Sequence, residues 1–164
     1  MEIKLLVIDV DGTLTDGKIY YGNNDVEIKA FNAKDGALLK PLPFFGIRTV
    51  FLTGRKSEAV LRRATDLNAM AIQGIENKFD ELRKLMKEYC IEPVQCAYIG
   101  DDLNDYSAMK ICGFKACPAD AAIEIKSICD YVSEFNGGHG AVRDICTFIL
   151  QRDGKYDKVL DFYH

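Results

Sequence analysis

The first strand-like segment of the chain ends in two aspartates that are one residue apart. Residues 3–8 form a nearly unbroken apolar run, which is typical of a central parallel strand buried on both faces. Asp9-Val10-Asp11-Gly12-Thr13 follows directly, and the alternation of an extended chain would point both carboxylates the same way. Like charges at a buried strand end repel, so the pair requires a cation, a shared proton or heavy solvation. On its own, the segment would also fit an ordinary acidic turn.

Three further signals make a functional interpretation stronger than that of a turn. One is Thr53-Gly54-Arg55 after a second apolar run, and another is Lys78 at the start of a helical pattern. The third is the segment Gly100-Asp101-Asp102-Leu103-Asn104-Asp105 after a third apolar run. In a parallel sheet, ligands bind at the carboxyl ends of the strands, so we expect these segments to meet Asp9 at one edge.

The order of apolar runs and helical patterns predicts the fold class. Strand-like runs alternate with segments of helical spacing, and this alternation indicates a parallel sheet with right-handed crossovers. We therefore expect one domain over residues 1–164, with an α/β, Rossmann-like parallel sheet and helices on both faces. The strands are expected at 3–8, 48–52, 69–72, 96–99 and 114–117, and the helices near 60–67, 79–89, 103–111 and 141–150.

Two segments depart from this alternation. Residues 18–31 predict a β-hairpin with a turn-rich tip at 22–25, and an isolated hairpin needs a surface to pack on. A helix beginning near Asp35 should end early at Pro41 and Pro43. Residues from about 153 to 164 form a polar, aromatic tail, which we expect to be mobile unless a neighbour holds it.

Composition excludes several classes of protein. The net charge of −4 argues against a general nucleic-acid binder. No run approaches 18 apolar residues and Met1 leads directly into the first strand without a signal peptide, so we expect a cytoplasmic protein without a membrane partner. Six cysteines without a Cys-x-x-Cys pair indicate reduced thiols. With only two histidines, any metal should be a hard cation such as Mg²⁺ held by carboxylate oxygens.

The four motifs together resemble the haloacid dehalogenase superfamily, whose members carry an Asp-x-Asp pair, a Thr or Ser, a Lys and an acidic pair. The resemblance implies that Asp9 attacks phosphorus and that Asp11 protonates the leaving alcohol and then deprotonates water. Members that attack carbon do not use the second aspartate, so Asp11 favours phosphoryl transfer, as in a phosphatase or a phosphomutase. Thr53 would donate to a phosphoryl oxygen, and Lys78 would add a positive charge.

The same resemblance implies the remaining site residues. Mg²⁺ would be held by the carboxylates of Asp9 and Asp101 and by the backbone carbonyl of Asp11. Asp102 and Asp105 would support these ligands without touching the substrate. The expected substrate-binding residues are Asp11, Thr53, Gly54, Arg55, Arg63, Lys78 and Asn104.

A finer resemblance covers nearly the whole chain. Residues 9–17, 31–36, 53–58, 97–105 and 137–143 are similar to the small phosphatases acting on 3-deoxy-D-manno-octulosonate 8-phosphate, an activity of lipopolysaccharide biosynthesis. In that family there is no cap domain, and inserted hairpins assemble a homotetramer in which neighbours cover each active site. Residues 78–100 leave room only for a helix and a strand, in keeping with a capless form.

Particular residues bear on the substrate. Arg55 matches the eight-carbon enzymes, whereas relatives acting on nine-carbon keto-deoxy sugar phosphates tend to have Glu there. Thr13 stands where Val is frequent, and His139 stands where Arg is usual. Pro41 and Pro43 alter the helix that follows Asp35. The loop at 137–140 should offer free backbone N–H groups to an anion, with Arg55 or Arg63 holding the sugar carboxylate.

Two alternatives of different kinds stay open. Related domains fused to sialic-acid-activating synthetases have lost catalytic residues and serve as tetramerisation modules. The presence of Asp9, Asp11, Thr53, Lys78 and Asp101 argues against such a role. A nucleic-acid 3′-phosphatase is disfavoured by the acidic net charge and by the lack of a basic, aromatic-lined groove.

Overall fold

The computed structural model describes residues 2–23 and 26–163, so two of the expected hairpin-tip residues, Asn24 and Asp25, lie outside the described residues. Within this part of the chain, the main sheet is parallel and six-stranded, with the order β5-β4-β1-β6-β7-β8. The predicted fold class is confirmed, as are the five predicted strands; the edge strand β8 was not predicted. The strands are β1 (Leu5–Ile8), β4 (Arg48–Thr53), β5 (Met70–Gln73), β6 (Cys96–Ile99), β7 (Phe114–Cys117) and β8 (Tyr131–Val132).

Strand β1 lies in the middle of the sheet and sets the register of its neighbours. All four of its residues are buried, as the continuous apolar run predicts. Ile8 pairs with Phe51 of β4 on one side and with Ile99 of β6 on the other. The three strands therefore end at nearly the same level, and the polar residues that follow them, including Asp9 and Asp101, share one edge of the sheet.

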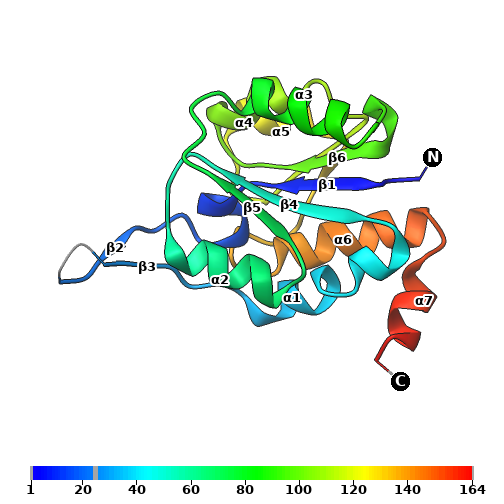
Figure 1. Cartoon of the computed structure of the whole chain (residues 1–164), viewed down its shortest axis with the longest axis horizontal. Coiled ribbons are helices and arrows are strands. Elements are labelled where there is room, and N and C mark those ends of the chain that lie inside the picture. The colour runs from blue at the N-terminus through cyan, green and yellow to red at the C-terminus, as the bar shows by residue number, and fades with distance from the viewer. Residues whose placement is uncertain (1, 24–25, 164) are drawn as a thin grey trace.

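Helices cover both faces of the sheet (Figure 1). On one face lie α1 (Ala33–Leu39), α2 (Glu58–Asp66) and α6 (Ala141–Arg152). On the other face lie α3 (Lys78–Glu88), α4 (Leu103–Met109) and α5 (Ile123–Lys126). Each face has its own apolar core. Helix α2 packs on its core through Val60 and Ala64, whereas Leu61 is 43% exposed.

Short helical turns connect these elements. One turn, η1 (Val10–Leu14), follows β1 almost immediately. Another, η2 (Leu42–Phe45), begins just after Pro41, and a third, η3 (Pro93–Gln95), precedes β6. Helix α1 ends at Leu39, so the prediction that the prolines stop this helix early is confirmed.

The predicted hairpin is present but its strands are short. β2 (Tyr20–Tyr21) pairs antiparallel with β3 (Glu27–Ile28), and the pair projects beyond the end of the main sheet (Figure 1). Apolar side chains on such a projection gain nothing from the core of their own chain. Five of them are exposed: Ile19, Tyr20, Tyr21, Val26 and Ile28.

The C-terminal segment, expected to be mobile unless a neighbour holds it, forms a helix, α7 (Tyr156–Asp161). Val159 is fully buried, and the rings of Phe162 and Phe44 lie 5.2 Å apart. Lys155 Nζ donates to the carbonyl of Phe45 over 2.9 Å. The chain thus holds its own tail by apolar burial, at the end of the molecule away from the hairpin (Figure 1).

The segment between Lys78 and Gly100 bears on the predicted absence of a cap. Its elements are α3, η3 and β6, which leave no room for an additional domain. Among residues 2–23 and 26–163, no segment forms a separate cap over the sheet edge. No helix within these ranges has both the length and the apolar character that crossing a membrane requires.

Candidate active site

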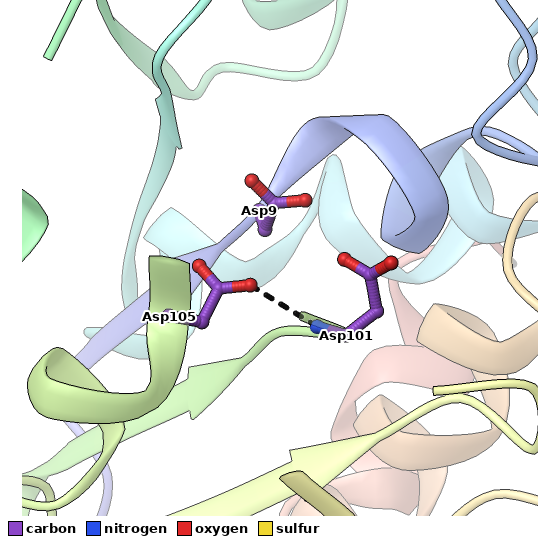
Figure 2. Close-up of side chains that lie close together, drawn as sticks. All are labelled: Asp9, Asp101 and Asp105. Atoms are coloured by element: carbon purple, nitrogen blue, oxygen red, sulfur yellow. Dashed lines mark hydrogen bonds between the residues drawn. The ribbon is translucent and has the colours of Figure 1, made fainter. Parts of the chain in front are cut away.

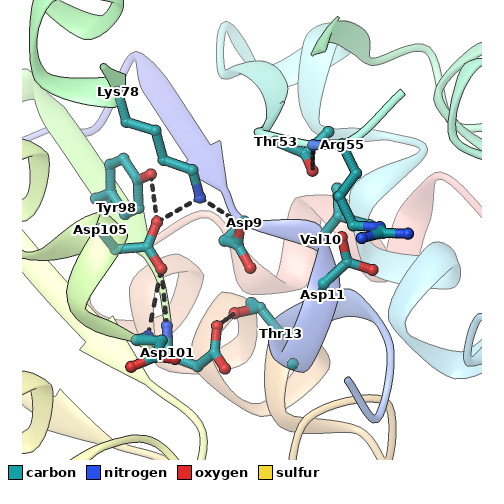
Figure 3. A network of polar contacts seen from close by, with 12 residues as sticks. Asp9, Val10, Asp11, Thr13, Thr53, Arg55, Lys78, Tyr98, Asp101 and Asp105 are labelled. Atoms are coloured by element: carbon teal, nitrogen blue, oxygen red, sulfur yellow. Dashed lines mark hydrogen bonds and ion pairs between the residues drawn. The ribbon is translucent and has the colours of Figure 1, made fainter. Parts of the chain in front are cut away.

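Asp9 and Lys78 form a buried ion pair at the end of the central strand. Asp9 is 4% exposed, and its backbone N–H donates to the carbonyl of Ile99 over 2.9 Å. Lys78 is 3% exposed at the first position of α3, where Asn77 caps the helix. Its ammonium group donates to Asp9 Oδ1 and, over 2.7 Å, to Asp105 Oδ1 (Figure 3). The parallel crossover therefore brings together two residues that are 69 positions apart in the chain.

Asp105 organises this side of the site. It is fully buried on α4, and Oδ1 also accepts from the hydroxyl of Tyr98 over 2.8 Å. Oδ2 accepts from the backbone N–H of Asp101 over 3.1 Å (Figure 2). A Cβ on Gly100 would lie 2.6 Å from Asp105 Cγ, so only glycine fits there. Sequence reasoning missed Tyr98, although a lone hydroxyl in a buried strand requires a polar partner.

Asp9, Asp101 and Asp105 form an acidic cluster (Figure 2). One carboxylate oxygen from each lies within 4.8 Å of the others. Asp101 Oδ1 accepts from the hydroxyl of Thr13 over 3.3 Å, and a Cβ on Gly12 would lie 2.0 Å from Asp101 Oδ2. The loop therefore leaves that oxygen free of steric competition from a side chain.

This cluster fits a hard divalent cation. Both oxygens of Asp105 already accept from protein donors, whereas Asp9 and Asp101 each keep carboxylate capacity for a metal. Oxygen ligands of this kind are those that Mg²⁺ takes in proteins. The geometry thus favours Asp9 and Asp101 as ligands, with Asp105 in a supporting position.

The pKa values of the acidic cluster also favour a bound cation. Burial and the charge of Asp105 raise the pKa of Asp9 well above its ordinary value. Burial and Asp105 also raise the pKa of Asp101 to about 6. Burial opposes the charge of Lys78, but Asp9 and Asp105 outweigh it and raise the pKa of that ammonium group. A divalent cation would favour the ionised form of both aspartates.

Asp11 does not point toward the same cluster as Asp9, so the expectation from strand alternation is wrong. The extended chain ends at Asp9, and the next residues form the turn η1, in which Gly12 has a φ of 99°. This turn removes the alternation, and Figure 3 shows Asp11 on the Arg55 side of the loop. The carboxylate of Asp11 instead forms an ion pair with Lys29, a residue that sequence reasoning did not single out.

Thr53, Gly54 and Arg55 follow β4 at the same edge of the sheet. Thr53 is 2% exposed, and its Oγ1 accepts from the backbone N–H of Arg55 over 3.2 Å, which leaves the hydroxyl proton available. Gly54 is exposed directly after the strand. The guanidinium of Arg55 is bonded to Glu27 of the hairpin, and Arg55 and Lys29 lower the pKa of Glu27 to about 2.

The structure gives Arg63 a packing role and leaves Asn104 at the surface. Arg63 donates to the carbonyl of Asn32 over 3.0 Å, and a Cβ on Gly36 would lie 2.5 Å from its guanidinium. These contacts join α2 to α1. Asn104 is exposed in the first turn of α4, and Asp102 caps that helix by accepting from Leu103 over 2.8 Å. The substrate roles of Arg63 and Asn104 stay predictions.

The glycine-rich loop at 137–140 packs against η1 and does not present a row of free N–H groups. Gly137, Gly138 and His139 donate their N–H groups to Asp120, Thr13 and Asn136, respectively. A Cβ on Gly137 would lie 1.8 Å from the carbonyl oxygen of Gly12, so glycine is required. The expectation that this loop offers free N–H groups to an anion is therefore wrong at these three positions.

The first turn of α6, next to the same loop, already has a carboxylate partner. Asp35 is 1% exposed, and its Oδ1 accepts from the N–H of Arg143 over 2.8 Å. A carboxylate near a helix N-terminus stabilises the partial positive charge there. This contact, which joins α1 to α6, was not predicted and reduces the attraction of that terminus for a second anion.

The fold and the acidic cluster define the class of protein, and the comparisons agree. The model of the family described as haloacid dehalogenase-like hydrolase matches residues 70–145. This range contains Lys78 and the whole segment from Gly100 to Asp105.

The curated relatives narrow the class to one family. The 3-deoxy-D-manno-octulosonate 8-phosphate phosphatase of Salmonella typhi is 40% identical over 157 residues, covering 95% of this chain and 84% of that protein. The phosphatase of the same name from Yersinia pestis is 38% identical, covering 94% of this chain and 83% of that protein. The chain belongs to the family of 3-deoxy-D-manno-octulosonate 8-phosphate phosphatases.

A solved structure from this family contains ligands. The phosphatase of Moraxella catarrhalis, in complex with a magnesium ion, a phosphate ion and a 3-deoxy-D-manno-octulosonate (KDO) molecule, superposes with a TM-score of 0.94 at 39% identity. The match covers 99% of this chain and 94% of that one. The cobalt-bound enzyme of Haemophilus influenzae gives a TM-score of 0.89 at 39% identity, covering 94% and 91% of the two chains.

Proposed function

We propose that the chain is a Mg²⁺-dependent phosphatase that hydrolyses 3-deoxy-D-manno-octulosonate 8-phosphate through an aspartyl-phosphate intermediate. The observation that carries the proposal is the arrangement of three buried residues, Asp9, Lys78 and Asp105, around the half-buried Asp101 in a member of this phosphatase family. The magnesium, phosphate and sugar acid bound to the Moraxella catarrhalis enzyme support both the cation and the substrate class.

The first step is attack of a carboxylate on a phosphate ester, and repulsion between anions is its main obstacle. Two unit charges 4 Å apart repel by about 1 kcal/mol in water and by about 4 kcal/mol at an effective dielectric constant of 20. Mg²⁺, held by Asp9, Asp101 and the Asp11 carbonyl, would supply the charge that offsets this repulsion. Lys78 holds Asp9 Oδ1, which leaves Oδ2 to attack phosphorus, and the Thr53 hydroxyl donates to a phosphoryl oxygen.

Asp11 acts on the protons of both half-reactions. When the Asp9–phosphorus bond forms and the ester bond breaks, Asp11 gives its proton to the leaving alcohol oxygen. In the second half-reaction, it takes a proton from the water that attacks the acyl phosphate, and Asp9 is released as a carboxylate. This division of work leaves Asp9 as the nucleophile and Asp11 as the acid and base.

The choice of sugar acid rests on the family and on one side chain. Arg55 follows Thr53 and Gly54, as in the eight-carbon enzymes, and this residue favours the eight-carbon acid over a nine-carbon keto-deoxy sugar phosphate. The side chain of Arg55 is 38% exposed and its guanidinium is bonded to Glu27, so a substrate carboxylate has to share or replace that partner. A noncatalytic assembly module is disfavoured, because every residue required for phosphoryl transfer is present.

The assembly we propose is a homotetramer in the cytoplasm, without a nucleic-acid or membrane partner. The exposed apolar side chains of the hairpin need cover, and hairpins from other copies of the chain would supply it. A neighbouring subunit would then close the open sheet edge that lacks a cap. The six cysteines are free thiols, in keeping with a reducing compartment.

A turnover screen tests this proposal. Phosphate release is measured with Mg²⁺ for the eight-carbon and nine-carbon keto-deoxy sugar phosphates and for hexose phosphates that lack a 2-keto acid. We expect the highest kcat/KM for the eight-carbon acid and loss of activity in EDTA. Equal turnover of all sugar phosphates would overturn the substrate assignment, and full activity in EDTA would overturn the metal assignment.

A further inference from the structure

Most of the described hairpin residues are exposed, but one lysine side chain at the base of the hairpin is buried. Lys29 follows β3, and its side chain is only 2% exposed, whereas neighbouring Ile28 is 56% exposed. Burying an ammonium group is costly unless it is paired. The two partners of Lys29 are the carboxylates of Asp11 and Glu27, with 2.8 Å between Lys29 Nζ and Glu27 Oε1.

These pairs continue into a chain of four charged side chains. Glu27, which is 15% exposed, also bonds the guanidinium of Arg55 through Oε2. The order Asp11, Lys29, Glu27, Arg55 alternates in sign and crosses from the loop after β1 to the loop after β4. The hairpin is therefore attached by charge to both strand ends that form this part of the site.

Lys29 contacts one particular atom of Asp11. The ion pair is made to Oδ1, and the side chain of Asp11 is 21% exposed. An oxygen held by an ammonium group is a poor carrier of a proton, so Oδ2 is the oxygen left to exchange protons with the substrate. Fixing a carboxyl group in this way reduces its rotation and sets the direction in which its second oxygen faces.

We propose that Lys29 is a positioning residue, which holds Oδ1 of Asp11 so that Oδ2 faces the leaving oxygen of the substrate. The proposal rests on the phosphatase activity proposed above. In the first half-reaction the Asp9–phosphorus bond forms, the phosphorus–oxygen ester bond breaks, and the proton on Oδ2 passes to the leaving oxygen. In the second, a proton from the attacking water returns to Oδ2 as the acyl phosphate is cleaved. No oxidant or further reactant is required.

This role predicts a dependence on the leaving group, which a general structural role does not. An alkoxide or a phenoxide leaves poorly without a proton, since phenol has a pKa of about 10. 4-Nitrophenoxide is a far better leaving group and needs little help from an acid. Misplacing Asp11 should therefore slow phenyl phosphate and alkyl phosphates much more than 4-nitrophenyl phosphate.

The experiment compares Lys29→Met with wild type on phenyl phosphate and 4-nitrophenyl phosphate, in the presence of Mg²⁺. We expect kcat/KM to fall by about tenfold to a hundredfold on phenyl phosphate and by less than about threefold on 4-nitrophenyl phosphate. Lys29→Arg should recover much of the kcat/KM that Lys29→Met loses on phenyl phosphate, because arginine keeps the positive charge. Lys18→Met is the matched control. Lys18 is a hairpin lysine that pairs with Asp16 and has a side chain 69% exposed, and its loss should leave kcat/KM unchanged on both substrates.

Two outcomes would overturn the proposal. One is an equal loss on both esters, and the other is a Lys29→Met enzyme that matches wild type on both. If Lys29→Met dissociates the assembly, Lys29→Arg is measured in the intact assembly instead. Its ratio of kcat/KM on phenyl phosphate and on 4-nitrophenyl phosphate must then be close to the wild-type ratio. A wild-type enzyme that hydrolyses no phosphate ester would instead refute the proposed function itself.

Discussion

The strand-end centre and the hairpin are both required by the proposed function, yet they are stabilised in different ways. The centre is defined as Asp9, Lys78, Asp101 and Asp105. Its residues lie just after buried strands of the main sheet or in the first turns of the helices that pack on that sheet. The hairpin, residues 18–31, has two-residue strands and exposed apolar side chains. The centre is built into the core of one chain, whereas the hairpin is joined to the sheet by ion pairs at its base and, in the tetramer we propose, would pack against other copies of the chain.

Because the two regions are stabilised differently, substitutions in them should affect different properties of the protein. Substitutions in the centre should alter chemistry and the stability of the single chain together, because its charges are buried. Substitutions of the exposed apolar side chains of the hairpin should alter assembly and activity with little effect on the folding of the single chain.

The largest effect is expected for Asp9→Asn, which removes the nucleophile. The amide attacks phosphorus poorly and carries no charge for Mg²⁺, so kcat/KM should fall by at least about 10³-fold. Steady-state kinetics measure the loss, and circular dichroism checks that the fold is intact. A well-folded Asp9→Asn enzyme that keeps a tenth of wild-type activity would remove Asp9 from its proposed role.

Lys78→Met should damage both chemistry and stability. It leaves the buried carboxylates of Asp9 and Asp105 without their shared cation, and breaking such a buried pair costs about 3–5 kcal/mol. Urea denaturation measures the free energy of unfolding, and kinetics should show a loss of about 10²-fold or more. A change in unfolding free energy below about 1 kcal/mol would show that the centre is less dependent on this pair than its burial indicates.

Ile19→Asp tests the hairpin side of the comparison. Ile19 is 44% exposed on the hairpin, and we expect the charge to shift a tetramer toward smaller species and to lower activity with it. Val94→Asp is the matched control, since Val94 is 45% exposed on η3, far along the chain from the hairpin. Light scattering distinguishes the two variants. A fully active monomer would refute the proposed assembly.

Glu27→Gln should give the smallest effect, and it depends on pH. The pKa of Glu27 is lowered from 4.5 to about 2 by Arg55 and Lys29, so its ionisation stabilises the folded state above pH 4.5. That contribution is lost as the pH falls from 4.5 toward 2. We expect the stability difference between wild type and Glu27→Gln to be at most about 1 kcal/mol at neutral pH and to vanish in that range. A difference that grows as the pH falls would contradict the ion pairs.

The centre could largely be foreseen from the sequence because its residues follow apolar runs that end at one edge of a parallel sheet. The roles assigned to these residues are still predictions, but the structure brings Asp9, Lys78, Asp101 and Asp105 together. Tyr98 was missed because its hydroxyl meets Asp105 only after α4 has folded back over β6.

The hairpin side could be predicted as an element but not in its contacts. Strand alternation fails at Asp11 because η1 begins immediately, with Gly12 at a positive φ that few other residues adopt. The pairing of Asp11 with Lys29 joins positions 18 residues apart and depends on where the hairpin folds back. Local patterns cannot give such a contact, nor the burial of Val159 that orders the C-terminal helix.

The most direct test of the proposed mechanism is to look for phosphate on Asp9 during turnover. Protein is mixed rapidly with 3-deoxy-D-manno-octulosonate 8-phosphate and Mg²⁺, quenched in acid, digested and analysed by mass spectrometry. We expect an acyl phosphate on the peptide that contains Asp9, absent when Mg²⁺ is removed and absent in Asp9→Asn. Phosphate release at the wild-type rate in Asp9→Asn, or phosphorylation of a different residue on the reaction pathway, would contradict it.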